Sequence, residues 1–130
     1  MHPQLARGIA FMVAALVLYT YAVFSGRRQG LHFKHLVAFG LGLASDAIGT
    51  MAMSALTRDV GPAPDWHHYS GVVSLGGMGL HFVLALGATL VRRADAINRT
   101  FHRVSLTIYT LWLLAFVSGG AAGMMKMSAP

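Results

Sequence analysis

The sequence predicts an all-α integral membrane protein, folded as a four-helix up-down-up-down bundle that forms a single transmembrane domain over residues 1–130. Three observations carry this prediction. Of the 130 residues, 55% are hydrophobic and only 11% are charged, whereas a soluble domain has about 25% charged residues. The apolar residues are gathered into four long runs, and the connections between these runs are short. A chain of this length is enough for one domain.

Each apolar run is long enough to cross a bilayer, because a spanning helix needs about 20 residues to cover about 30 Å of hydrocarbon. Backbone groups cannot stay unpaired in lipid, and the runs are too long and continuous for barrel strands. We therefore expect helices at about 7–25, 33–56, 68–92 and 98–125. The first run is long for a cleaved signal peptide, and no clean small-x-small cleavage site precedes Arg27 and Arg28, so we expect a retained helix.

The connections fix the topology of the bundle. Residues 26–30 join the first two segments, 57–65 join the next pair and contain Gly61, Pro62 and Pro64, and 92–99 join the last pair. Short connections make successive helices antiparallel. The second and fourth helices are then parallel and lie diagonally across the core.

The basic residues are divided unequally between the two ends of the bundle. One end carries seven of them, and the other carries three: Arg27, Arg28, Lys34, Arg92, Arg93, Arg99 and Arg103 against Arg7, Arg58 and Lys126. Cytoplasmic loops are enriched in Lys and Arg. We therefore expect both termini outside, in a bacterial inner membrane. The net charge of +6 forms loop clusters and no nucleic-acid face.

Several classes of function are excluded or disfavoured by what the sequence lacks. It has no cysteine, so disulfides, thiolate nucleophiles and iron–sulfur ligation are excluded. It also contains no Walker loop, no dinucleotide glycine motif and no Ser–His–Asp order. A soluble-type hydrolase or nucleotide enzyme is therefore not expected.

The seven histidines are the most informative residues, because ionisable groups within membrane helices usually face the interior and mark a site. On the second segment, His35 and the acidic Asp46 are eleven positions apart and share a face. On the third segment, His67 and His81 are fourteen positions apart and also share a face. His68 is a weaker alternative to His67. The separation of His67 and His81 on one helix resembles that in di-haem cytochromes b. Those proteins need a matching histidine pair on a second helix, and none is found here.

His35 and His102 begin parallel, diagonal helices at the same end of the bundle. This placement favours bis-histidine ligation of haem b, with one imidazole on each side of the iron. Arg99, Arg103 and Lys34 are placed to pair with haem propionates. Alternatively, both histidines lie at the membrane interface and hydrogen-bond to lipid headgroups.

Asp46 and His81 fall at similar depth when counted inward from the charged ends. They are expected to form a buried pair, a proton-relay step or, with His67 or another third ligand, a non-haem iron, zinc or copper site. Alternatively, Asp46 bonds its own helix or Thr50, and His81 is a neutral core histidine. Met124, Met125 and Met127 suggest copper only weakly, because methionines in an apolar chain are mostly core or lipid-facing.

Four stretches of the sequence resemble the HsmA family of small four-helix membrane proteins. They are KHLVAFGLGLASDAIGTMAM, the H-x-x-x-G at His67 and Gly71, LHFVLALGA, and FHRVSLTIYTLWLLAFVSG. The resemblance extends from about Tyr19 to Met124. It implies the four-helix fold and polar positions at His35, Asp46, Thr50, His67, His81 and His102. The doubled His67–His68 and the proline-rich loop before it depart from the family pattern.

Three functions remain open from the sequence. The first is a b-type haem protein that transfers electrons, with quinone or another redox partner; if it is an enzyme, it is an oxidoreductase. The second is a metal-binding, or proton- or metal-conducting, membrane protein centred on His81, Asp46 and His67. The third is an accessory subunit of a larger membrane complex, or a homo-oligomer, whose glycine-rich faces are docking surfaces.

Overall fold

The computed structural model describes residues 2–91 and 95–128, apart from the side chains of residues 95–98, 126 and 127. It contains four α-helices: α1 (Pro3–Gln29), α2 (Phe33–Val60), α3 (Asp65–Leu90) and α4 (Asp95–Ser128). No strand occurs within the described ranges. The predicted all-α four-helix bundle is confirmed. Arg92 and Arg93, which entered the charge comparison, lie outside the described residues, as do the side chains of Lys126 and Met127.

The first two helices begin and end where local chemistry dictates. At the start of α1, the His2 side chain accepts a hydrogen bond from the backbone N–H of Gln4, and Pro3 occupies the first turn, where its missing N–H costs nothing. Gly30 (φ 79°) and Gly61 (φ 94°) end α1 and α2. Positive φ is strained for residues with a Cβ, so glycine is the residue that permits each chain reversal.

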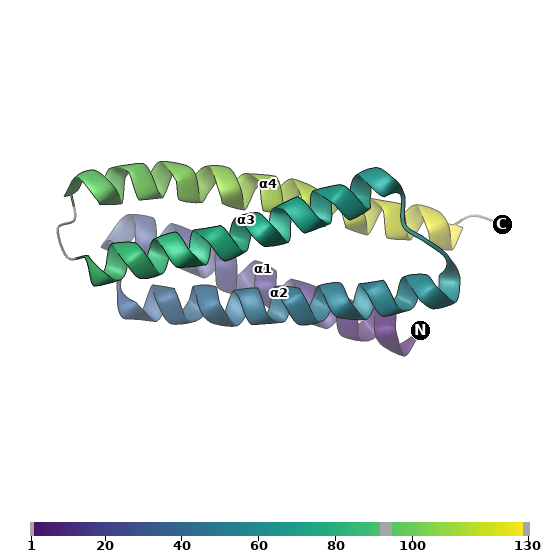
Figure 1. Cartoon of the computed structure of the whole chain (residues 1–130). Coiled ribbons are helices and arrows are strands. Elements are labelled where there is room, and N and C mark those ends of the chain that lie inside the picture. The colour runs from purple at the N-terminus through teal and green to yellow at the C-terminus, as the bar shows by residue number, and fades with distance from the viewer. Residues whose placement is uncertain (1, 92–94, 129–130) are drawn as a thin grey trace.

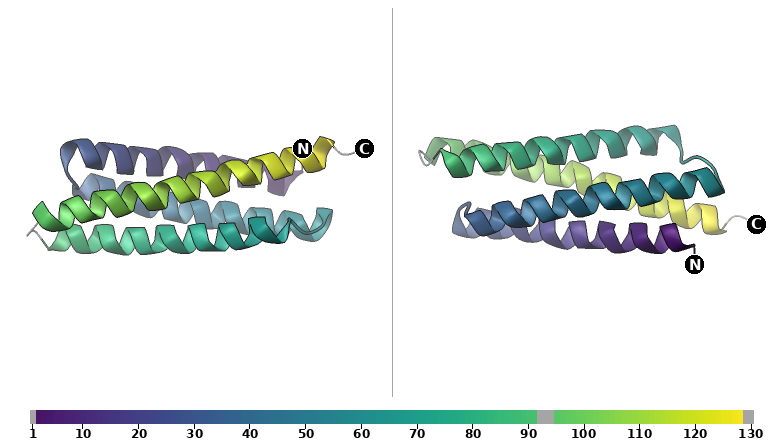
Figure 2. Two further views of the ribbon diagram at one scale, coloured as in Figure 1. Left: turned by 90° about the horizontal axis from the view of Figure 1, so that it is seen from above. Right: turned by 60° about the horizontal axis from the view of Figure 1, so that its bottom comes forward.

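The helices form two antiparallel hairpins, α1–α2 and α3–α4, laid beside each other (Figure 1). Packing is most extensive within each hairpin, and the two hairpins contact each other less, through α2 with α3 and α1 with α4. Both termini lie at one end of the bundle, opposite the α1–α2 connection and the end where α3 finishes and α4 begins (Figure 2). Helices α2 and α4 are diagonal, as expected from the short connections.

The α1–α2 hairpin is tight because glycines on each helix let side chains of the other helix approach its backbone. A Cβ built on Gly42 would lie 2.8 Å from the Tyr19 ring, and one on Gly8 would lie 2.7 Å from Met53 Cε. These distances are shorter than carbon atoms tolerate. The glycines of α2, such as Gly42, therefore serve the packing of this helix against α1.

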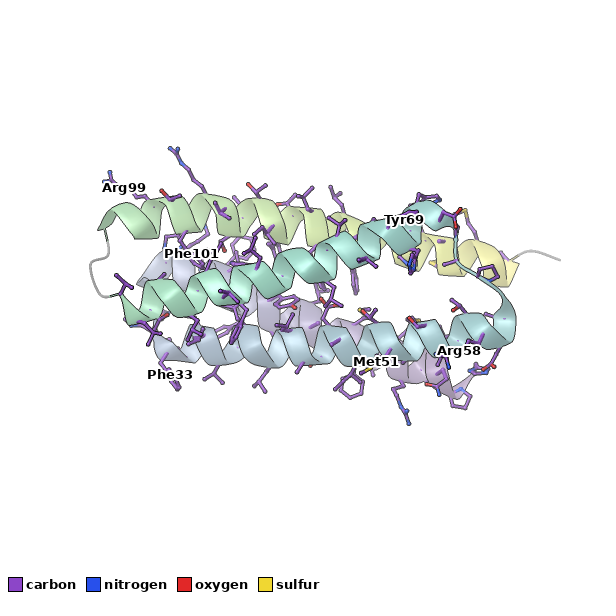
Figure 3. The ribbon with its side chains drawn as sticks, viewed as in Figure 1. Phe33, Met51, Arg58, Tyr69, Arg99 and Phe101 are labelled. Carbon is purple, nitrogen blue, oxygen red and sulfur yellow. The ribbon has the colours of Figure 1, made fainter. Side chains whose placement is uncertain are left out.

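The outward faces of all four helices are apolar. Val17, Val73 and Leu114 are 62%, 71% and 62% exposed, and Phe33 and Met51 also point away from the bundle (Figure 3). Each helix has a stretch that is long and apolar enough to cross a membrane. In length and composition the chain is therefore compatible with an integral membrane protein that spans the bilayer four times.

Candidate functional site

The bundle interior contains a short series of polar side chains among apolar and aromatic ones. Of the described residues, four that are polar or charged are buried: His35, Asp46, His81 and Ser105. They come from three different helices, α2, α3 and α4. Because a polar group in an apolar interior is costly unless it is hydrogen-bonded, the partners of each one indicate whether it serves the fold or is available to a ligand.

His81 has no hydrogen-bond partner at all. Its side chain is 0% exposed, and both ring nitrogens are buried without a donor or acceptor. The ring of Phe39 on α2 meets it edge-on at 4.5 Å between centroids, and Phe101 on α4 lies at 5.5 Å. An unsatisfied buried polar group costs about 1–3 kcal/mol. A ligand that bonds to His81 would recover this cost.

The position of His81 follows from the periodicity of α3. Its inward face is formed by Met78, His81 and Ala85, which are all buried and spaced by three and four residues. Figure 3 shows Phe101 on the neighbouring α4, near the end that carries Arg99. His81 therefore faces the space where the two hairpins meet, which is the less extensively packed contact of the bundle.

His35 is also fully buried, but both of its ring nitrogens are bonded. Nδ1 accepts from the backbone N–H of His32 at 3.0 Å, and Nε2 is 2.9 Å from Ser25 Oγ. Since Nδ1 acts as an acceptor, the neutral ring carries its proton on Nε2 and donates it to Ser25. In this arrangement His35 caps α2 and joins it to α1. Neither nitrogen is free for a metal.

Asp46 accepts two hydrogen bonds on the same oxygen. Trp112 Nε1 donates to Oδ2 at 2.8 Å, and the Tyr19 hydroxyl donates to it at 3.3 Å. The three side chains come from α2, α4 and α1, and the Tyr19 and Trp112 rings meet edge-on at 5.0 Å. The carboxyl group is therefore fixed by aromatic donors.

The expected pair between Asp46 and His81 is not formed, and the two residues do not lie at the similar depth that was predicted. His81 contacts Phe39, which precedes Asp46 by seven residues, or about 10 Å along a helix. Counting from the charged ends assumed that α2 and α3 end together. Instead, α3 extends further than α2 at the end away from the termini (Figure 1).

His67 and His102 differ in what surrounds them. His67 is half-buried, its Nδ1 is buried without a partner, and its ring lies against Gly119 of α4, where a Cβ would come within 2.5 Å of His67 Cε1. Its neighbour His68 is exposed, so His67 is the inward member of the pair. His102 is half-buried, and its carbonyl accepts from Arg27 Nη1 at 2.9 Å.

The predicted propionate partners Arg99 and Arg103 are exposed and stand two residues on either side of Phe101. Within the described part of the chain, no group of three or more His, Cys, Asp or Glu side chains is close enough to hold a metal ion. Met124 and Met125 are each 66% exposed and turn away from the core.

Two features of the interior were not identified from the sequence. The first is the pair of hydrogen-bond donors to Asp46, Tyr19 and Trp112. No sequence pattern marked them, although both are large residues whose polar group needs a partner when buried. The second is the Thr20 Oγ1 to Tyr109 hydroxyl hydrogen bond of 2.7 Å, which joins α1 to α4. The spacing of Tyr109 and Trp112, three residues apart, is the signal that could have placed both on one inward face.

A scan against protein-family models, a search of curated proteins and a search of solved structures found no match to this chain. The fold and the buried residues therefore define the class of protein by themselves. It is an all-α four-helix bundle whose helices can each span a membrane, with an unpartnered histidine between its two hairpins.

Proposed function

We propose that this chain is a membrane-embedded b-type haem protein of electron transfer, in which His81 is the iron ligand. The observation that carries the proposal is the His81 imidazole, which is fully buried with both nitrogens unpartnered. Neutral imidazole is the commonest protein ligand of haem iron, and a dry, aromatic surrounding suits a porphyrin. Haem supplies one-electron redox chemistry, and the chain supplies binding, orientation and exclusion of water.

The residues near His81 fit a flat, apolar group with acidic substituents. Phe39 and Phe101 offer aromatic faces to a ring system, and their side chains must turn aside to admit it. Phe39 belongs to the other hairpin, and the limited contact between the hairpins makes its movement cheaper than one within a hairpin. Arg99 and Arg103 flank Phe101 and are placed for charge-assisted bonds to propionates.

This proposal moves the ligand from the diagonal pair of His35 and His102 to His81. Using His35 would break its bonds to His32 and Ser25 and would leave the start of α2 uncapped. His81 loses nothing by binding iron. The resemblance to the HsmA family, which implies polar positions at both His35 and His81, accommodates either choice and remains a prediction.

The orientation in the membrane belongs to the same proposal. Among the described side chains, the end opposite the termini has five cations and no acidic group: Arg27, Arg28, Lys34, Arg99 and Arg103. At the other end, Arg7 and Arg58 are balanced by Asp59 and Asp65. The positive-inside rule then makes the first end cytoplasmic, in a bacterial inner membrane, with quinone or another carrier as redox partner.

The test is the haem content of protein purified from haem-replete cells, measured as the pyridine haemochrome after extraction. We expect near-stoichiometric haem in the wild type, loss of haem in His81→Ala, and retention in the matched controls His35→Ala, His67→Ala and His68→Ala. Circular dichroism and gel filtration check that each variant is folded. Colourless wild-type protein, or folded His81→Ala that keeps its haem, would overturn the proposal.

A further inference from the structure

Asp46 is the one acidic residue that lies away from the helix ends, and the two oxygens of its carboxyl group differ. Both donors, Trp112 Nε1 and the Tyr19 hydroxyl, meet at Oδ2, and Oδ1 has no protein partner. Oδ1 is nevertheless not fully enclosed, because the enclosed polar atoms without a partner in the described part of the chain belong to His67 and His81. The 3% exposure that Asp46 keeps therefore includes surface on Oδ1 that a water molecule can touch.

The surroundings of Asp46 favour a neutral carboxyl group. None of the described Lys, Arg and His side chains is paired with it, and both of its donors are uncharged. A carboxylate in an apolar interior without a cation is strongly unfavourable. A neutral carboxyl group has a carbonyl oxygen that accepts and an O–H that donates. Oδ2 is then the carbonyl oxygen that accepts from Trp112 and Tyr19, and Oδ1 carries the proton.

The helix that faces α2 places no charge at the depth of Asp46. Phe39 packs on His81, and α2 and α3 are antiparallel. Asp46, seven residues after Phe39, therefore stands level with Ser74, seven residues before His81. Ser74 is half-buried and offers a hydroxyl group. His67 and His81, the ionisable side chains on this face of α3, are each about 10 Å from that level along the helix axis.

The cluster of buried hydrophobic residues lies on one side of Asp46. On α2 its members all precede Asp46, on α4 they end at Trp112, and on α3 they all follow Ser74. Its members on these three helices are Leu36, Ala38, Phe39, Met78, Ala85, Phe101, Tyr109 and Trp112. The interior between Asp46 and the arginine-rich end is therefore closed by packed apolar side chains.

The interior on the other side of Asp46, toward the termini, is less apolar. Thr50, about one turn further along α2, is half-buried, as is His67 on α3. The fully buried hydrophobic side chains described on this side are small, namely Ala52 and Ala122. A water molecule that reaches Oδ1 therefore meets fewer apolar obstacles from the end that bears the termini.

We propose that Asp46 is a proton-binding site, which carries its proton on Oδ1 and exchanges it, through water beside Ser74, with the end of the bundle that bears the termini. An acid at mid-depth that is reached from one side can take up a proton there and hold it inside the membrane. This role goes beyond the proposed haem function and does not depend on it, since neither the proton nor its route involves iron.

Dicyclohexylcarbodiimide is the probe of the bound proton, because it enters membranes and reacts with protonated carboxyl groups. The carboxyl oxygen bonds to the central carbon of the reagent, and the proton moves to one of its nitrogens. The adduct then rearranges to a stable N-acylurea, so the chain gains the mass of a whole reagent molecule. With the full-length protein in nanodiscs at neutral pH, we expect this label at Asp46, located by peptide mass spectrometry.

The acidic residues of the chain supply matched controls for this labelling. The label should be lost in Asp46→Asn and kept in Asp59→Asn and Asp65→Asn, since both of these residues are exposed. A carboxylate that only holds the helices together would not react, so a folded wild type without label at Asp46 would overturn the protonated state. If Asp46→Asn fails to fold, the position of the label in the wild type decides by itself.

Access from the termini is tested with single cysteines, because the sequence has none. Ser74→Cys should react with a charged methanethiosulfonate added on the side of the termini, forming a disulfide as methanesulfinate leaves. Met78→Cys, one turn deeper at a 1% exposed position, and Val73→Cys, at a 71% exposed position on the outward face, are the controls. Both should react at least about tenfold more slowly, because the reagent needs a thiolate in contact with water.

The bound proton and its route can fail separately. Equal reaction of Ser74→Cys and Met78→Cys would overturn the assignment of the packed cluster as a barrier. Reaction of Ser74→Cys from the arginine-rich side would overturn access from the termini. Label at Asp46 together with one-sided reaction of Ser74→Cys would support both parts of the proposal.

Discussion

The indole nitrogen of Trp112 lies 2.8 Å from Asp46 Oδ2 and donates a hydrogen bond that joins α4 to α2 across the diagonal of the bundle. These two helices are not neighbours, and the bond spans the core between the hairpins. Tyr19 of α1 donates to the same oxygen. Three of the four helices are thereby tied to one carboxyl group, which gives this acidic residue a structural role independent of any cofactor.

Trp112→Phe should destabilise the protein by about 1–3 kcal/mol, since it removes one of the two donors to a buried oxygen. The chain offers a matched control, because its other tryptophan, Trp66, is 54% exposed. Trp66→Phe should change the free energy of unfolding by less than about 0.5 kcal/mol. Reversible unfolding by SDS in mixed micelles, followed by circular dichroism, measures both. Equal effects of the two substitutions would contradict the assigned role of Trp112.

Gly42→Ala should destabilise the α1–α2 hairpin, because the new methyl group would lie 2.8 Å from the Tyr19 ring. Overpacking of this kind costs about 1–3 kcal/mol, and here it also moves a donor to Asp46. Gly76→Ala is the control, since a Cβ at Gly76 meets nothing within 4 Å, and its stability should be unchanged or slightly higher. The same micellar unfolding assay decides, and a neutral Gly42→Ala would show that the hairpin is looser than described.

His35 should be the Nε2–H tautomer, because its Nδ1 accepts the backbone N–H of His32. Nitrogen-15 NMR of protein labelled at histidine distinguishes the two ring nitrogens and reads the tautomer directly. Ser25→Ala should lower stability by about 0.5–1.5 kcal/mol through loss of the hydrogen bond from Nε2. Finding Nδ1 protonated would rule out the capping geometry at the start of α2.

The orientation can be measured cleanly because the sequence has no cysteine. Single cysteines at Gln29 and Pro64, which are exposed at opposite ends of the bundle, should react with a membrane-impermeant maleimide from opposite sides. In intact cells, Pro64→Cys should be labelled and Gln29→Cys should be labelled only after the membrane is permeabilised. The reverse pattern would place the arginine-rich end outside, and labelling of both would exclude the four-span topology.

The sequence by itself determined the number of helices, their antiparallel order and three of the buried polar residues. These properties depend on the length of apolar runs, on short connections and on helical periodicity. His35, Asp46 and His81 stood out because a titratable residue in an apolar run is rare, and all three are buried. The breaks at Gly30 and Gly61 were visible for the same local reason.

Only the tertiary structure decided which of these residues meet. Depth counted along the sequence paired Asp46 with His81, but the stagger of α3 against α2 places Phe39 opposite His81 and leaves Asp46 to Tyr19 and Trp112. Partners across a bundle depend on how far each helix extends and how it is rotated. Both are set by packing, such as Tyr19 over Gly42, and leave no periodic trace in the sequence. His35, His81 and Asp46 are alike as residues in an apolar run, but packing partners separate the bonded His35 from the unpartnered His81.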